Sequence, residues 1–117
     1  MNDITGEVSA IVADGGVEEG LCLVSSPHTT AGITVNENAD PDVKKDMMME
    51  IGKIVPREDG YRHMEGNSAA HLKATLTGIS VTLPINGGRI ALGTWQGIYF
   101  CDYDGPRRRR ITVTIIG

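Results

Sequence analysis

The three histidines of the chain are the residues best suited to carry chemistry. His28 lies in the segment SSPHTT, His63 in YRHMEGN and His71 in NSAAHLK, all of them polar, glycine-rich or typical of a helix start. Neutral imidazoles that converge can bind a transition-metal ion and leave positions open for water or substrate. The spacing matches no short ligand motif such as HExxH, and from spacing alone the commoner outcome is that each histidine makes a local hydrogen bond or lies in solvent.

A second polar group stands in the segment NENADPD, at residues 36–42. Asp40 followed by Pro41 is typical of a helix start, where the aspartate caps the first turn. Glu37 and Asn38 have no such structural explanation. A carboxylate at a strand end could ligate a metal, act as a general base or orient a histidine, and solvated loop residues are the alternative.

The run of four arginines at residues 107–110 is the main candidate for binding an anion. In an extended chain Arg107 and Arg109 point to one side and the other two to the opposite side. We therefore expect Arg107 to bind a phosphate or carboxylate group, with Asp102 and Asp104 as neighbouring partners, and the even-numbered arginines to face solvent. An exposed edge strand is the usual alternative for such a run.

Two further polar residues are candidates for contacting a ligand. Asn67 stands at a predicted helix start, where backbone amides can bind anions, although most helix starts bind only their own cap. Gln96 follows the only tryptophan in the segment GTWQG. The chain contains no Walker loop, no dinucleotide-binding GxGxxG and no GxSxG nucleophile elbow, which disfavours several common enzyme classes.

Composition limits the partners of the chain. Fifteen acidic residues against 11 basic ones give a formal charge of −4, which disfavours a nucleic-acid backbone as partner. No apolar run reaches the length of a membrane helix and the N-terminus lacks the features of a signal peptide, so the expected location is cytoplasmic. The two cysteines, Cys22 and Cys101, are far apart and are expected to pack in the core.

The elements that must position these residues form an α+β pattern. Strands are predicted over residues 3–13 and 20–25 as an opening hairpin, then over 32–36, 79–85, 89–95, 97–103 and 108–116. Helices are predicted from Asp40-Pro41 to about Val55 and from Asn67-Ser68 to Gly78. Clustered strands with two inserted helices favour antiparallel, sandwich-like sheets in a single domain over residues 1–117.

Four separate motifs resemble the YjbQ-like (UPF0047) family. They are HTTAGITVNENADPDV at residues 28–43, NSAAHLKA at 67–74, GTWQ at 93–96 and DGPR at 104–107. The resemblance covers residues 4–117 in the family's order. It implies an α+β fold with extensive antiparallel sheet, a homotrimer, and a histidine-lined pocket at or near a subunit boundary. It also implies bound metal ions and a weak thiamine-phosphate synthase activity.

The resemblance also implies roles for individual residues. The metal-binding and catalytic candidates are His28, His63 and His71, with Glu37 as a further catalytic candidate. The substrate-binding candidates are Asn38, Asn67, Gln96 and Arg107. An imidazole site suits zinc or nickel rather than magnesium.

The sequence departs from the family pattern at two places. Family members usually have an additional N-terminal strand before the segment matching Asp3, so one sheet edge is expected to be missing or replaced. They commonly have glutamate at the position of Asp102, so its contact with an arginine or ligand is in question.

Two functional hypotheses follow. The first is a transferase resembling thiamine-phosphate synthase, in which a divalent metal and an arginine stabilise the pyrophosphate that leaves. The second is a non-catalytic module that holds a metal or a small anion. Release of pyrophosphate above a histidine-substituted control would distinguish them.

Overall fold

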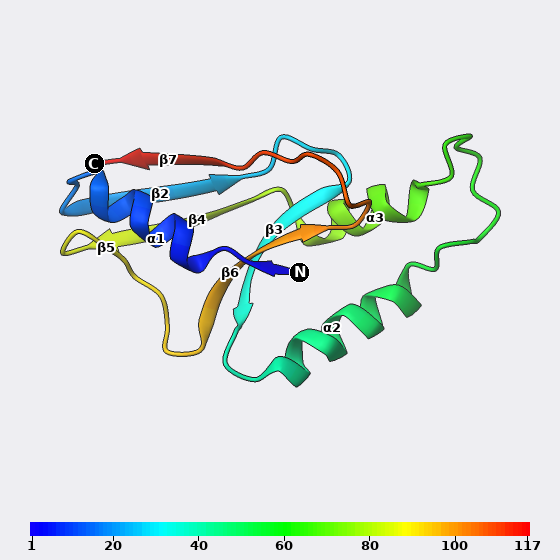
Figure 1. Ribbon diagram of the computed structural model, residues 1–117, viewed down its shortest axis with the longest axis horizontal. Helices are drawn as coiled ribbons and strands as arrows, with labels where there is room; N and C mark the ends of the chain where they lie inside the picture. Colours follow the sequence, from blue (N-terminus) through cyan, green and yellow to red (C-terminus); the bar gives the residue numbers. More distant parts are fainter.

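Two antiparallel sheets and three helices make up the protein. The computed structural model describes residues 1–117. The first sheet has the strand order β1-β6-β3 and the second β5-β4-β2-β7, as Figure 1 traces along the chain. Their bounds are β1 Asn2–Asp3, β6 Gln96–Asp102, β3 Ala31–Glu37, β5 Arg89–Ile90, β4 Ser80–Asn86, β2 Glu19–Ser25 and β7 Thr112–Ile116. The predicted α+β class with antiparallel sheets is confirmed, with three helices in place of two.

The hydrophobic core lies between the two sheets and under the first helix, α1 (Thr5–Asp14). Alternate residues of β2, Cys22 and Val24, are fully buried, as expected for a strand with one face on the core. Ile33 of β3 and Ile98 of β6 join them from the other sheet. Cys22 and Cys101 are both buried and free, in agreement with a packing role.

The predicted strand over residues 3–13 is wrong, because most of it forms α1. Val8 and Val12 are the residues that α1 buries, and their separation of four places both on one helix face. Only Asn2 and Asp3 pair with β6, opposite Phe100 and Tyr99. The expected opening hairpin is therefore absent, and β2 pairs instead with β4 and β7.

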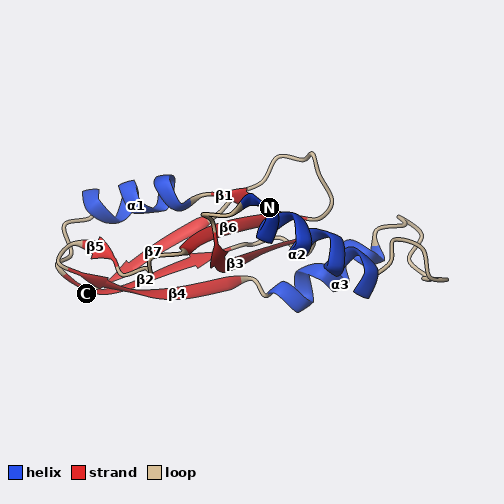
Figure 2. Cartoon of the chain, turned by 90° about the horizontal axis from the view of Figure 1, so that it is seen from below, coloured by secondary structure: helices blue, strands red, loops and turns tan.

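The second helix, α2 (Pro41–Ile54), begins as predicted. The Asp40 side chain accepts a hydrogen bond of 2.9 Å from the Asp42 N–H, and Pro41 occupies the first turn. None of its 14 residues is buried. The helix lies beside α3 at the end of the molecule away from α1 (Figure 2).

The third helix, α3 (Ser68–Thr77), also forms where predicted and packs on β3. The backbone N–H of Ile33 donates to the Gly78 carbonyl at 3.0 Å, which joins the strand to the end of the helix. No helix combines the length and the apolar character needed to cross a membrane.

The C-terminal half keeps the predicted strands with changed bounds. Residues 89–95 were predicted to be extended, but only Arg89 and Ile90 form a strand, β5. The last strand, β7, begins at Thr112, so the four arginines lie in the connection that precedes it. The strand alternation expected to separate odd from even arginines therefore does not apply to them.

Candidate functional site

A polar pocket lies where three connecting segments meet. It encloses about 300 Å³ and none of its nine lining residues is hydrophobic. The β2–β3 connection supplies Pro27, His28, Thr29 and Thr30, the start of α3 supplies Glu65, Asn67 and His71, and the β6–β7 connection supplies Arg107 and Arg109. We call it the histidine pocket.

Arg109 fixes one wall of the histidine pocket. Its Nη2 donates to Asp102 Oδ1 at 2.7 Å and to Thr30 Oγ1 at 2.9 Å, and its side chain is 12% exposed. Burial raises the pKa of Asp102, but the hydrogen bonds from Arg109 and from the Asp104 N–H outweigh it and hold this pKa below its ordinary value. The shorter aspartate thus keeps the contact with an arginine that was in question.

Arg107 fixes a second wall through carboxylates on two segments. Its Nη2 donates to Asp104 Oδ2 at 2.8 Å and to Glu65 Oε2 at 3.1 Å, while Nε donates to the Asp104 carbonyl at 3.0 Å. Asn67 Nδ2 donates to the same two carboxylates. In Arg107 and Arg109 alike, the Nη1 group makes no hydrogen bond within the chain, so each guanidinium retains donors for a ligand.

His28 is held by the arginine segment. Its Nε2 accepts a hydrogen bond of 2.8 Å from the backbone N–H of Arg110. A neutral imidazole with Nε2 as acceptor carries its proton on Nδ1. His28 therefore has a fixed tautomer, and the nitrogen that accepts from Arg110 is not free to bind a metal ion.

The other two histidines lie next to each other. The rings of His63 and His71 are 5.6 Å apart and nearly perpendicular. His71 lines the histidine pocket and also a shallower hollow with His63. No group of three histidine, cysteine or carboxylate side chains is placed to hold a metal ion, so within one chain the three histidines do not form the expected ligand set.

Glu37, Asn38 and Gln96 lie away from the histidine pocket. Glu37 and Gln96 pair at the far end of β3, and six residues of extended chain separate Glu37 from Ala31 beside the pocket. At about 3.3 Å per residue this is roughly 20 Å. Asn38 Nδ2 donates to Asp3 Oδ2, and Gln96 Oε1 accepts from the Gly93 N–H.

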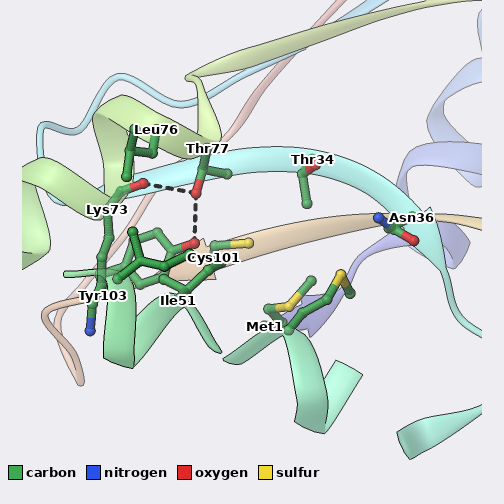
Figure 3. A pocket seen from close by; sticks show the side chains of 11 residues that line it. Met1, Thr34, Asn36, Ile51, Lys73, Leu76, Thr77, Cys101 and Tyr103 are labelled. Atoms are coloured by element: carbon green, nitrogen blue, oxygen red, sulfur yellow. Dashed lines mark hydrogen bonds between the residues drawn. The ribbon is translucent and has the colours of Figure 1, made fainter. Parts of the chain in front are cut away.

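Two further cavities lie along α3, and the first of them adjoins the histidine pocket through Asn67. One, of about 260 Å³, is lined by Arg57, Lys73, Tyr103, Asp104 and residues of the α3 start, including Asn67. The other, of about 290 Å³, is mainly apolar and lies between α2, α3 and the β3–β6 sheet (Figure 3). We call them the Lys73 pocket and the apolar pocket. Lys73 and Tyr103 line both.

Tyr103 is a fixed part of the wall between these two cavities. Its hydroxyl lies 2.6 Å from Thr77 Oγ1, and Thr77 in turn donates to the Lys73 carbonyl (Figure 3). Burial is the main reason that the pKa of Tyr103 rises to about 12. The tyrosine is therefore neutral near pH 7 and leaves the charge of this region to its arginine, lysine and aspartate neighbours.

Five lining residues of the histidine pocket were not among the predicted site residues, namely Pro27, Thr29, Thr30, Glu65 and Arg109. Thr30 is buried and carried no signal, whereas Arg109, 12% exposed, was expected on the same side as Arg107 but was given no role of its own. The closeness of two aspartates and four arginines within residues 102–110 could have predicted ion pairs among them. Glu65 carried no signal, because its partner Arg107 is 42 residues away.

The comparisons with known proteins agree over nearly the whole chain. The family model described as UPF0047 protein YjbQ-like matches residues 1–117. The UPF0047 protein YugU of Bacillus subtilis is 52% identical over 118 residues, which cover 100% of this chain and 89% of that protein. A UPF0047 protein of Methanocaldococcus jannaschii is 48% identical over 115 residues, covering 98% of this chain and 83% of that protein.

Solved structures show the same fold. A crystal structure of an uncharacterized conserved protein of the YjbQ/UPF0047 family from Clostridium acetobutylicum has a TM-score of 0.96 and 52% identity, covering 98% of this chain and 89% of that one. A protein of unknown function from Sulfolobus solfataricus has a TM-score of 0.95 and 36% identity, covering 99% and 86%. None of these four names assigns a reaction, so the expected thiamine-phosphate synthase activity gains no support from them. What they establish is that the chain belongs to the UPF0047 protein YjbQ-like family.

Proposed function

We propose that the protein binds a small phosphorylated molecule, or another small anion, in the histidine pocket. The observation that carries the proposal is the pair of arginines in a pocket without hydrophobic residues. Arg107 and Arg109 are held rigidly by carboxylates on one side, and each keeps its Nη1 donors unused. Fixed guanidinium groups with spare donors suit phosphate and carboxylate ligands.

The charged residues around the histidine pocket indicate that a bound anion needs an additional positive charge. Glu65, Asp102 and Asp104 contribute three negative charges against two positive charges from the arginines. An anion that enters this group adds negative charge to a net charge of −1. Its binding is therefore strengthened by one further positive charge, which can be a proton on an imidazole or a divalent metal ion.

In the first version, the imidazole of His71 binds the anion directly and no metal ion takes part. His71 lines the histidine pocket and makes no side-chain hydrogen bond within the chain, so its ring is available to a ligand. Phosphate binding in this version needs no metal ion, and His71→Ala weakens it.

In the second version, a zinc or nickel ion accompanies the anion. The adjacent rings of His63 and His71 favour it, because two imidazoles at this separation can face one ion. One chain lacks a third ligand at that point, so another subunit or the anion itself would have to supply the rest. Phosphate binding in this version requires the added metal ion, and both His63→Ala and His71→Ala weaken it.

The two versions differ in whether phosphate binding requires a metal ion, so one titration series with and without Zn²⁺ distinguishes them. Calorimetric titration of inorganic phosphate into the metal-free protein, and into protein with added Zn²⁺, measures the affinity at constant pH. Arg107→Gln should weaken phosphate binding about tenfold in either version, since a charge-assisted contact is lost. Arg108→Gln is the matched control, because Arg108 lines no described pocket. Equal affinity in all three proteins would overturn the proposal.

A transferase reaction of the kind catalysed by thiamine-phosphate synthase is the activity that we propose to test first. The chain's own contribution would be to hold the departing pyrophosphate with Arg107 and Arg109 and to move a proton at His71 or His28. The assay measures thiamine phosphate and released pyrophosphate for the wild type and for His71→Ala. If the wild-type rate is no higher than that of the variant, the protein binds the anion without turning it over, as the hypothesis of a non-catalytic binding module states.

We further propose that the protein assembles as a homotrimer. Its exposed surface of 7270 Å² is larger than the approximately 6200 Å² of a compact monomer of 12.5 kDa. Its radius of gyration is 15.5 Å, where about 13 Å is typical of this length. Exposed apolar residues at α2 and α3, namely Ile54, Leu72, Leu76 and Ile79, support burial by another subunit.

Assembly would also give Glu37, Asn38 and Gln96 a role, since they cannot reach the histidine pocket of their own chain. We propose that they complete the pocket of a neighbouring subunit. Coexpressing Glu37→Gln with His71→Ala should then restore part of the activity or phosphate affinity that each variant lacks alone. A mixture no better than the separate variants would place Glu37 outside the site.

A further inference from the structure

The Lys73 pocket differs from the histidine pocket in its balance of charge. Arg57 and Lys73 line it, and neither makes an ion pair within the chain. The Lys73 ammonium lies 6.0 Å from the centre of the Tyr103 ring, which places it on the wall of the pocket. An ammonium and a guanidinium without carboxylate partners at one polar cavity are complementary to an anionic group.

The only carboxylate of the Lys73 pocket, Asp104, already has a cationic partner. Asp104 Oδ2 accepts from Arg107 Nη2 and from Asn67 Nδ2, both at 2.8 Å. The carboxylate of Asp104 therefore pairs with Arg107 of the histidine pocket and makes no ion pair with Arg57 or Lys73. The charges of Arg57 and Lys73 remain for whatever occupies the cavity.

Asn67 is the wall that the two pockets share. Its Nδ2 donates to Glu65 and Asp104, and since carboxylates only accept, these two bonds fix which end of the amide is the oxygen. The remaining oxygen, Oδ1, is buried and has no hydrogen-bond partner. The amide nitrogen of Asn67 is thus held by carboxylates on both sides, and the residue stands as a fixed partition between the two cavities.

We propose that the Lys73 pocket is a second anion subsite for the same ligand, which would extend across Asn67 from the histidine pocket. The ligand class is a small molecule with an anionic group at each end, of the kind represented by a sugar bisphosphate. Arg107 and Arg109 hold one anionic group, and Arg57 and Lys73 hold the other. This inference rests on the proposed binding of an anion in the histidine pocket.

Calorimetric titration with fructose 1,6-bisphosphate, fructose 6-phosphate and inorganic phosphate tests the inference on the full chain. These compounds are probes of the ligand class. The affinity for the bisphosphate should be at least about tenfold higher than that for the monophosphate, because the bisphosphate makes charge-assisted contacts with a second pair of cations. Lys73→Met keeps the aliphatic part of the side chain that lines the apolar pocket and removes the charge.

Lys73→Met should abolish most of the gain in affinity that the bisphosphate shows over the monophosphate. It should leave the affinity for inorganic phosphate within about twofold of the wild-type value. Arg57→Gln should do the same, and Lys53→Met, whose lysine pairs only with Glu50 on the surface of α2, should leave the gain unchanged. A bisphosphate that binds no more tightly than the monophosphate would overturn the second subsite but not the first. Absence of binding by all three probes, with and without Zn²⁺, would overturn the proposed function itself.

Discussion

At the scale of single residues, Arg109 and Asp102 have the clearest influence on the geometry of the histidine pocket. They join the β6–β7 connection to the β2–β3 connection, because Arg109 also donates to the hydroxyl of the buried Thr30. The pair is largely shielded from water, with the two side chains 12% and 17% exposed. Removing one partner leaves a charge with reduced hydration, which costs more than an ordinary surface contact.

Asp102→Asn should lower the free energy of unfolding by about 2–3 kcal/mol near neutral pH, because Arg109 loses its ion pair. The pKa of Asp102 is held below its ordinary value of 3.8, so its contribution is fully present above that value and is lost as the pH falls through the lower folded-state pKa. Urea unfolding at about pH 7 and about pH 3 measures both effects. Asp46→Asn on α2, which makes no ion pair, is the control, and a difference from wild type that grows toward acid would contradict the assignment.

His28 should carry its proton on Nδ1 when neutral, since Nε2 accepts from Arg110. Nitrogen chemical shifts of the imidazole identify this tautomer directly. In His28→Ala the Arg110 amide loses its acceptor, so its hydrogen exchange should accelerate. His63→Ala is the control, because His63 makes no hydrogen bond through its side chain, and unchanged exchange in His28→Ala would refute the contact.

At the scale of elements, the contact between β3 and the end of α3 sets the position of the helix that carries His71. Gly32 makes this contact possible, because a Cβ there would lie 2.6 Å from the Gly78 carbonyl oxygen and 3.0 Å from the Thr77 side chain. The neighbouring backbone cannot yield as a flexible side chain would. The position of His71 relative to the β2–β3 connection thus depends on the absence of one methyl group.

Gly32→Ala should lower the free energy of unfolding by about 1–3 kcal/mol through this overlap. Gly52→Ala, in the last turn of α2 and with open space around its Cβ, should instead raise it by about 0.5 kcal/mol, because alanine favours a helix. Thermal or urea unfolding of the two variants compares them under identical conditions. A stabilising Gly32→Ala would contradict the close packing of β3 and α3.

The sequence predicted those elements whose ends carry local signals. Asp40 and Pro41 mark the start of α2, and the alternation in β2 marks a half-buried strand. Residues 3–13 were misassigned because four apolar β-branched residues favour a strand. Ile4, Val8, Ile11 and Val12 are nevertheless spaced as on one face of a helix, and this local signal was overlooked.

The site was less predictable than the fold, because its contacts join distant segments. The arginines were recognised from composition, but the strand geometry used to separate them was wrong, since β7 begins only at Thr112. Arg109 is positioned by Thr30, 79 residues away. Glu37 and Gln96 have side chains suited to catalysis and to substrate binding. Pairing of β3 with β6 nevertheless places them at the opposite end of the sheet from His28.

At the scale of the whole molecule, elongation and exposed apolar surface require an explanation. The chain extends 50 Å along its longest axis and 20 Å along its shortest, and α2 buries none of its residues. A helix with an apolar stripe and no buried residue is stable when another surface covers the stripe. The homotrimer proposed above would satisfy that condition if its subunits meet at the end of the molecule that carries α2 and α3.

Sedimentation equilibrium should give three times the monomer mass of 12.5 kDa at micromolar concentration. Leu76→Glu in α3 should shift the equilibrium toward monomers, because it places a charge on the exposed apolar surface. Glu50→Gln on α2 should leave the mass unchanged. A monomer mass for the wild type would contradict the homotrimer.

Locating bound phosphate on the protein is the most direct test of the anion site proposed in the histidine pocket. Side-chain nitrogen resonances of the arginines and histidines, followed by NMR during a phosphate titration, report on each group separately. Saturable shifts are expected at Arg107, Arg109 and His71, with Arg89, in β5 at the edge of the four-stranded sheet, unaffected. Shifts confined to Arg89, or none at all with and without added Zn²⁺, would contradict an anion site in the histidine pocket.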